Sequence, residues 1–176
     1  MDLVSRQADE RGIKVEQTIE IEHRKLLGSS LYLKRMLMNI LSNAVKYNKD
    51  YGNIDLSCKE IPSHSTESTM LEFTCRDTGI GMSSGFKEHV FESFAREQKG
   101  GASKFGGTGL GMTITKNLAE KMGGTITFES KEGAGTTFVV RIPFRIDTDR
   151  DSKVEAGEKT EASIRGLHIL LAEDNE

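Results

Sequence analysis

The sequence lacks the features that would place it in several specialised classes of protein. Its 176 residues include only two cysteines, Cys58 and Cys75, with no CxxC or Cys/His ligand spacing. Because both lie in apolar runs, free buried thiols are favoured over a disulfide. The formal net charge of −3 gives no basic surplus, so no nucleic-acid partner is expected. No stretch approaches the roughly 20 apolar residues of a membrane span, and residues 1–12 lack the apolar centre of a signal peptide.

Hydrophobic periodicity predicts an α/β protein. Alternation predicts a strand at 14–21, and a period near 3.6 predicts a helix at 30–47 that begins at Ser29 or Ser30. The other expected elements are strands at 53–61 and 69–77, a short helix at 85–94, a helix at 109–122, and strands at 125–130 and 136–144. Since one face of each element is apolar, we expect a two-layer α/β sandwich, a mixed five-stranded sheet covered on one face by about three helices.

Four polar side chains lie together on the first long helix. With Asn39 at zero on a helical wheel, Asn43, Lys46 and Tyr47 fall within about 80° of it, beside the apolar arc. Asparagine is unfavourable inside a helix because its side chain competes for backbone partners. Two readings remain open here: a solvated flank, or amide oxygens that bind a hard cation such as Mg²⁺.

The stretch RDTGIGM places Asp77 at the end of a predicted strand, with Gly79 and Gly81 just beyond it. A tight turn uses the same residue types. An ionised Asp is also a good acceptor for an exocyclic amine, and glycines allow a flat ring to approach the backbone. Both interpretations remain open for this motif alone.

The stretch KFGGTGLGM places glycine at 106, 107, 109 and 111, directly before a helix. It is not a Walker A loop, because Met112 stands where a lysine would be needed, and it does not follow a strand as a GxGxxG turn would. It is either a packing turn or a row of backbone N–H groups that binds an anion at a helix N-terminus.

Together these stretches form a more specific pattern than any of them alone. NILSNAVKY, DTGIGM, VFESF and GGTGLGM, in this order, closely resemble the N, G1, F and G2 boxes of the sensor histidine kinase catalytic domain. GAGTTFVVRIP resembles the closing strand motif of that family, and the resemblance covers residues 10–144. It implies an ATP-binding α/β sandwich of the type shared with gyrase, a heat-shock chaperone family and the mismatch-repair ATPases. It also implies a long lid over ATP at 83–106.

The resemblance implies a role for each matching residue. Asn43 resembles the Mg²⁺ ligand, and Asp77 resembles the residue that binds the adenine amino group. Phe91 and Phe94 would anchor the lid. The residues implied in catalysis are Asn39, Lys46 and Arg96. The residues implied in ATP binding are Asn39, Asn43, Lys46, Tyr47, Asp77, Gly79, Gly81, Phe91, Phe94, Arg96, Gly107, Thr108, Gly109, Leu110, Gly111 and Thr137.

The same resemblance favours a kinase over a hydrolase. Gyrase-like relatives usually carry a Glu one helical turn before the metal-binding Asn, where it activates water, and here that position is Asn39. Phosphoryl transfer to a positioned nucleophile is therefore expected, with slow hydrolysis or a nucleotide-dependent conformational switch as the alternative. A degenerate scaffold would be expected to have lost Asn43, Asp77 or the glycines, and all are present.

No phosphoacceptor histidine is recognised in the chain. None of the four histidines lies in a sequence resembling the family's phosphoacceptor box, so we interpret them as structural or surface residues: His23, His64, His89 and His168. The resemblance thus implies a phosphoacceptor on a dimerization domain outside this chain, a response-regulator receiver as a second partner, and a homodimeric parent. We expect the chain alone to be monomeric and cytoplasmic, whether or not the parent is membrane-anchored.

The resemblance also divides the chain. Residues 164–176 resemble the opening of a receiver domain, in which Glu173 and Asp174 match the acidic pair that holds Mg²⁺. The expected divisions are the end of the dimerization helix at 1–12, the ATP-binding catalytic domain at 13–144, a charged linker at 145–163 and the truncated receiver start at 164–176.

Overall fold

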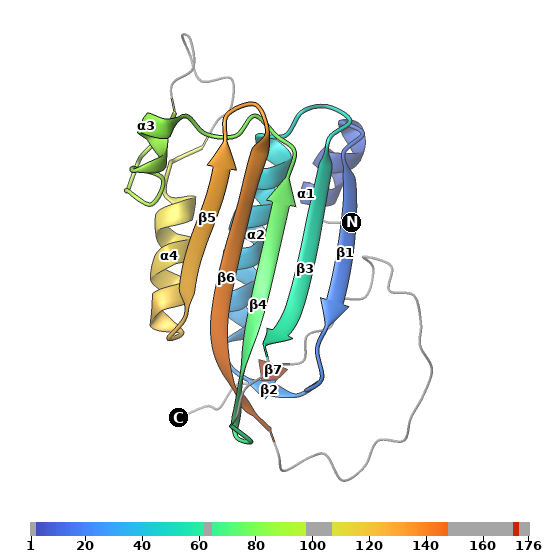
Figure 1. Ribbon diagram of the computed structural model, residues 1–176, viewed down its shortest axis with the longest axis vertical. Coiled ribbons are helices and arrows are strands. Elements are labelled where there is room, and N and C mark those ends of the chain that lie inside the picture. The colour runs from blue at the N-terminus through green and yellow to red at the C-terminus, as the bar shows by residue number, and fades with distance from the viewer. Residues whose placement is uncertain (1–2, 62–64, 98–106, 148–170, 173–176) are drawn as a thin grey trace.

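The structure, a computed structural model, describes residues 3–61, 65–97, 107–147 and 171–172. Its elements are α1 (Leu3–Glu10), β1 (Lys14–Glu20), β2 (Leu26–Leu27), α2 (Ser30–Lys46), β3 (Asn53–Ile61), β4 (Ser68–Asp77), α3 (Ser84–Lys87), α4 (Gly111–Lys121), β5 (Thr125–Lys131), β6 (Gly135–Ile146) and β7 (Leu171–Ala172). The long strands follow the order β1-β3-β4-β6-β5, with β1 parallel to β3 and the other neighbours antiparallel (Figure 1). The short strand β2 pairs with the end of β6, and β7 pairs with β2. The expected mixed sheet is confirmed.

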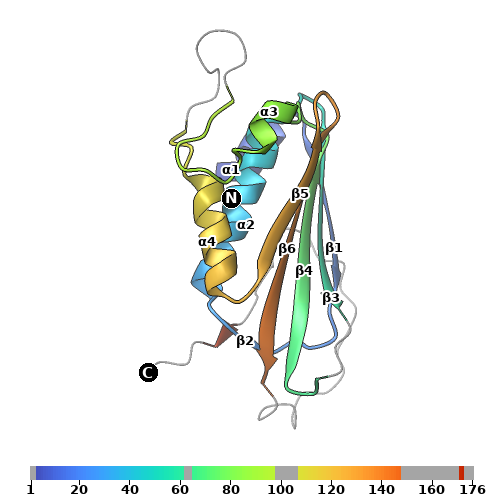
Figure 2. The same ribbon diagram turned by 60° about the vertical axis from the view of Figure 1, so that its left-hand side comes forward.

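The helices α1, α2 and α4 cover one face of the sheet (Figure 2). This two-layer arrangement follows from strands that alternate buried and less buried residues, because successive side chains point to opposite faces. The buried face of β4 carries Leu71, Phe73 and Cys75, and that of β6 carries Phe138, Val140, Ile142 and Phe144. These side chains form one core with the helices, so the expected sandwich is confirmed.

The helix α2 forms the centre of the helical layer. Its inward residues recur at helical spacing and include Leu33, Met36, Ile40 and Ala44, all at most 4% exposed. The side chain of Ser29 caps its first turn by accepting a hydrogen bond from the Tyr32 N–H at 3.3 Å. Burial of each large apolar side chain contributes about 1.5–3 kcal/mol, which fixes α2 firmly against the sheet.

The predicted helix at 85–94 is wrong over most of its length, because α3 ends at Lys87. Beyond it, the His89 N–H donates to the Phe86 carbonyl and the Glu92 N–H to the His89 carbonyl, three residues back instead of four. Phe94 has φ of 64°, which no right-handed helix contains. The segment is a series of turns that still buries Val90, 6% exposed, on the core.

The start of the chain contributes to the same core. The helix α1 buries Val4 and Ala8, at 8% and 2% exposure, beside α2 and β1.

The linker expected at 145–163 lies mostly outside the described residues, and of 164–176 only Leu171–Ala172 is described. No helix in the described part of the chain is long and apolar enough to cross a membrane.

Both cysteines are free thiols, as the sequence predicts. Burial, helped by the negative charge of Glu60, raises the pKa of Cys58 to about 11. Burial, with Asp77 and Asp55 nearby, raises the pKa of Cys75 to about 12. The thiolate is the reactive form, so the raised pKa values keep both thiols protonated and weakly reactive at neutral pH.

Candidate functional site

The last turn of α2 lies against the loop that follows β4. The Ile80 N–H donates to the Tyr47 carbonyl at 3.0 Å. A Cβ atom built on Gly79 would lie only 2.4 Å from the same carbonyl oxygen, so glycine is required there. This contact brings Asp77, at the end of β4, beside the helix that carries the polar flank of Asn39, Asn43, Lys46 and Tyr47.

Asp77 is a buried carboxylate with a fixed orientation. It is 8% exposed and lies on the sheet face that the helices cover. Its Oδ1 accepts hydrogen bonds from the N–H of Gly79 at 2.8 Å and of Thr136 at 3.3 Å. Burial raises the pKa of Asp77, and the two backbone N–H groups oppose that rise. Both bonds reach Oδ1, which leaves Oδ2 to accept from a ligand.

Gly81 positions this loop against the β5–β6 hairpin. It has φ of 61°, and an added Cβ would lie 2.1 Å from the Lys131 carbonyl oxygen. On either side of it, the Gly133 N–H donates to the Ile80 carbonyl at 2.8 Å and the Met82 N–H to the Ser130 hydroxyl at 2.9 Å. The glycine therefore joins two backbones that could not otherwise approach.

The register of β6 places Thr136 beside Asp77. Thr136 pairs with Asp77 across β4 and β6, is 7% exposed, and shares the buried face. Thr137, the residue taken from the sequence, pairs with Arg76 and therefore points to the opposite face. The threonine next to the carboxylate is thus Thr136, and the role in ATP binding that the resemblance implies for Thr137 stays a prediction.

A second set of residues gathers where α4 begins. An added Cβ on Gly107 would lie 2.9 Å from Lys46 Nζ, so the ammonium group of α2 faces this glycine segment. Lys46 Nζ also lies 4.7 Å from the centroid of the Tyr47 ring. Leu110 occupies the N-cap of α4, and its side chain cannot accept from the first turn. The Lys46 ammonium group and the uncapped N–H groups in the first turn of α4 together make this end of the site electropositive.

Asn39 connects α2 to the first turn of α4. Its Nδ2 donates to the Gly111 carbonyl at 3.2 Å and to the Thr115 hydroxyl at 3.3 Å. Thr115 is fully buried and donates to the same carbonyl at 2.8 Å. The sequence did not identify Thr115, although a threonine inside an apolar helix stripe is a usable signal. Asn39 holds the position of α4, an observation that the sequence could not supply.

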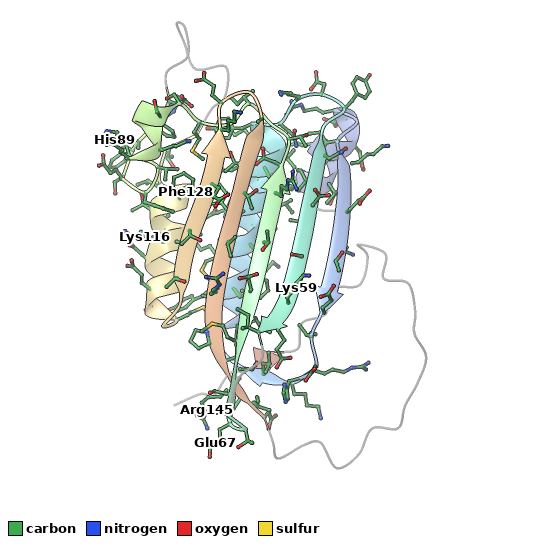
Figure 3. All side chains as sticks on the ribbon, viewed as in Figure 1. Lys59, Glu67, His89, Lys116, Phe128 and Arg145 are labelled. Atoms are coloured by element: carbon green, nitrogen blue, oxygen red, sulfur yellow. The ribbon has the colours of Figure 1, made fainter. Side chains whose placement is uncertain are left out.

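The segment after α3 approaches the same region. The rings of Phe91 and Phe128 form an edge contact with centroids 5.6 Å apart, and Lys116 Nζ lies 5.7 Å from the Phe91 centroid. Figure 3 labels Phe128 on β5 and Lys116 on the neighbouring α4. The Phe94 ring is 71% exposed, so it does not anchor the segment as the sequence interpretation expected. Its backbone does, because the Phe94 N–H donates to the Gly109 carbonyl at 3.1 Å.

The remaining predicted residues are only partly placed. Arg96 is exposed, and it follows Phe94 on the same segment. Thr108 and Leu110 lie between the glycines. Of the predicted lid at 83–106, residues 98–106 lie outside the described residues. The histidines His64 and His168, which are not part of the lid, also lie outside the described residues.

The two histidines in the described part of the chain are each paired with a carboxylate. His23 Nδ1 lies 2.5 Å from Glu60 Oε1, and His89 Nδ1 lies 3.0 Å from Glu92 Oε1. Glu92 raises the pKa of His89.

Residues 28–146 match the family described as histidine kinase-, DNA gyrase B- and HSP90-like ATPases. The chain belongs to this ATPase family. The curated relatives include the autoinducer 2 sensor kinase/phosphatase LuxQ of Vibrio harveyi, 35% identical over 92% of this chain and 19% of LuxQ. They also include the sensory/regulatory protein RpfC of Xanthomonas campestris, 30% identical over 86% of this chain and 24% of RpfC. This chain therefore spans about a fifth to a quarter of these relatives.

Solved histidine kinases have the same ATPase fold. Full-length ShkA in complex with AMPPNP is 27% identical, with a TM-score of 0.68 over 82% of this chain and 28% of ShkA. The catalytic domain of ThkA is 22% identical, with a TM-score of 0.64 over 80% of this chain and 85% of that domain. The expected fold and family are thus confirmed.

Proposed function

We propose that this chain binds Mg²⁺ and ATP between α2, the end of β4 and the start of α4, as the catalytic module of a sensor histidine kinase. The observation that carries the proposal is the combination of a buried carboxylate, Asp77, with an electropositive end formed by Lys46 and α4. Both ends border α2, so one extended ligand with a base and a phosphate chain suits them.

At the base end, Asp77 would recognise the adenine amino group. Its Oδ2 accepts one amine hydrogen, while Oδ1 stays bonded to the backbone. Gly79 lets the base approach the loop, and Thr136 lies beside Asp77. Gly81 fixes the loop on the hairpin, and Tyr47 packs near the base.

At the phosphate end, Lys46 and the first N–H groups of α4 would hold the phosphate oxygens. Gly107, Thr108, Gly109, Leu110 and Gly111 supply the backbone that borders them. Asn39 would act through Gly111 by positioning α4, and Arg96 would contact a phosphate when its segment closes.

The residues present fit a magnesium ion. Within the described part of the chain, the Asn43 side chain forms no hydrogen bond, so its amide oxygen is available on the flank of α2. A neutral amide oxygen suits Mg²⁺ when phosphates supply the negative charge. When bound, Mg²⁺ would supply positive charge that offsets the negative charge of the phosphates, with Asn43 as the residue that would hold it.

The proposed reaction is phosphoryl transfer to a histidine on another domain. A histidine nitrogen attacks the γ-phosphorus, the bond to the β-γ bridging oxygen breaks, and ADP leaves with that electron pair. Asn39 supports transfer over hydrolysis, because an amide donating to Gly111 cannot remove a proton from water. From the family resemblance we also propose the partners: a dimerization domain with the phosphoacceptor and a receiver domain, in a homodimeric parent with this module in the cytoplasm.

Calorimetric titration of ATP, with and without Mg²⁺, tests binding. We expect a Kd between about 1 μM and 1 mM for the unmodified chain, with the Mg²⁺ dependence altered in Asn43→Asp. Transfer of the γ-phosphate to an added acceptor domain from a hybrid kinase then tests the reaction. ATP binding with hydrolysis but no transfer would favour the slow ATPase, and no ATP binding would reject the proposal.

A further inference from the structure

Arg11 makes several contacts for a residue outside the site. Its Nη1 donates to the Val45 carbonyl at 2.7 Å and more weakly to the Lys46 carbonyl at 3.4 Å. Its Nη2 donates to the Asn48 carbonyl at 2.6 Å. Its Nε donates to Asp50 Oδ1 at 2.8 Å, which orients the guanidinium plane. The side chain is 28% exposed.

These contacts satisfy the end of α2. The last carbonyl groups of a helix have no partner within it, and they carry the negative end of the helix dipole. A guanidinium presents several N–H donors in a fixed plane, so it can bridge Val45 and Asn48 at once. A lysine ammonium in its place is a point charge and cannot bridge them in the same geometry.

The backbone around Arg11 fastens the same junction. The Tyr51 N–H donates to the Arg11 carbonyl at 2.9 Å. Gly12, with φ of 62°, ends α1, and an added Cβ there would lie 2.7 Å from the Tyr51 ring. The Ile13 N–H donates back to the Ala8 carbonyl at 2.9 Å. Arg11 directly follows α1 and bonds the end of α2, so the position of α1 is coupled to the end of α2 through this residue.

The capped turn carries groups of the proposed site. Lys46 and Tyr47 belong to it, and the Tyr47 carbonyl holds Ile80 and approaches Gly79, two residues from Asp77. Arg11 is thus separated from the base end by one helical turn and one backbone hydrogen bond. A shift of the turn would displace Lys46 and Gly79 together.

We propose that Arg11 is a positioning residue for the nucleotide site, which couples the orientation of α1 to the last turn of α2. This inference rests on the proposed function. A change in the orientation of α1 would therefore alter nucleotide affinity, although α1 does not contact the nucleotide. The coupling acts through contacts that are continuous from α1 to Gly79.

The test compares Arg11→Met, Arg11→Lys and the matched control Arg6→Met, which replaces an exposed arginine of α1. ATP affinity is measured by calorimetry with Mg²⁺ at a temperature where every variant is fully folded. Hydrogen exchange at the Tyr47 and Ile80 amides reports on the turn itself. We expect Arg11→Met to raise the Kd for ATP about three- to thirtyfold and to accelerate exchange at both amides.

Two further results separate positioning from a general loss of stability. Arg11→Lys should recover part of the affinity, because one carbonyl group is still capped, and Arg6→Met should match the unmodified chain. A Kd for Arg11→Met within twofold of the unmodified value, with exchange at Ile80 unchanged, would overturn the inference while leaving ATP binding intact. Absence of ATP binding by the unmodified chain would instead reject the proposed function and the inference with it.

Discussion

The two ends of the proposed nucleotide site are built in different ways. At the base end, added Cβ atoms on Gly79 and Gly81 would meet backbone carbonyls at 2.4 and 2.1 Å, and Asp77 is 8% exposed. At the phosphate end, among the described residues an added Cβ on Gly107 would meet just the tip of the Lys46 side chain, at 2.9 Å. The base end is fixed by backbone packed on backbone. The phosphate end combines one such contact, at Gly109, where an added Cβ would lie 2.8 to 2.9 Å from backbone atoms of Phe94 and Ala95, with the movable side chain of Lys46 beside Gly107.

We infer from this difference that the base end recognises the base, while the phosphate end adjusts to the phosphate chain. A base end whose backbone is already fixed loses little conformational entropy when the base binds. The phosphate end is bordered by side chains and by the segment around Phe94, and Phe94 itself is 71% exposed. This end can therefore adapt as the phosphate chain changes length. Substitutions of the base-end glycines Gly79 and Gly81 should therefore affect folding and binding together, and substitution of Lys46 at the phosphate end should affect binding alone.

The largest effect is expected for Gly81→Ala. A methyl group there meets the Lys131 carbonyl in a backbone conformation that side chains disfavour, so we expect a loss of about 3 kcal/mol or more in the free energy of unfolding. Urea denaturation measures it. Gly85→Ala is the matched control, because no atom of the described residues lies within 4 Å of its added Cβ. Equal stability of the two variants would contradict a base end fixed by the backbone.

Asp77→Asn should sharply weaken ATP binding without weakening the fold. The amide can still accept from Gly79, but its NH₂ group would face the adenine amine, at a cost of about 2–3 kcal/mol in binding. Because burial raises the pKa of Asp77, a neutral side chain is at least as easily buried. Calorimetry and thermal unfolding measure the two effects, with exposed Asp55→Asn as control. Unchanged affinity would remove Asp77 from the site.

Lys46→Met should show a smaller and more selective loss. We expect ATP affinity to fall by about 1–2 kcal/mol because a charge-assisted phosphate contact is lost, while adenosine affinity stays nearly constant. The control is Lys34→Met, on an exposed position of α2. An equal loss for adenosine and ATP would contradict the assignment of Lys46 to the phosphates.

The smallest effect on nucleotide binding is expected for Glu60→Gln, near the C-terminal end of β3. Burial alone would raise the pKa of Glu60, but hydrogen bonds from the Thr69 hydroxyl, the His23 backbone and ring, and the Glu22 N–H outweigh it and lower the pKa to about 2.

A lowered folded-state pKa means that this stabilisation is present above the unfolded value of 4.5 and is lost as the pH falls toward 2. Denaturation of Glu60→Gln between pH 2 and pH 5 should lack that part of the pH dependence, with ATP binding at pH 7 unchanged. Identical pH profiles for the two chains would contradict this account.

Local patterns predicted the elements well. The strand at 53–61 matches β3, and the helix at 30–47 exceeds α2 by one residue, because both have regular apolar spacing and clear ends. The helix at 85–94 failed because its apolar residues pack through turns. Thr136 was missed beside Asp77, because a shift of one residue along a strand reverses the face that a side chain occupies.

Contacts between distant segments were beyond the sequence. Arg11 reaches Val45 and Asn48, and Asn39 reaches Thr115, across separations that no periodicity encodes. These contacts depend on how α1, α2 and α4 pack on the sheet. The motifs therefore located the site, while its supporting residues required the fold.

The central claim is that both ends bind one nucleotide, and an amide-resolved NMR titration tests it most directly. With Mg²⁺ and ATP, the signals of Gly79 and Gly107 should shift together and fit one Kd, whereas adenosine should shift Gly79 far more than Gly107. Signals at the two ends that titrate with different Kd values, or a Gly79 signal that does not move at saturation, would contradict the claim.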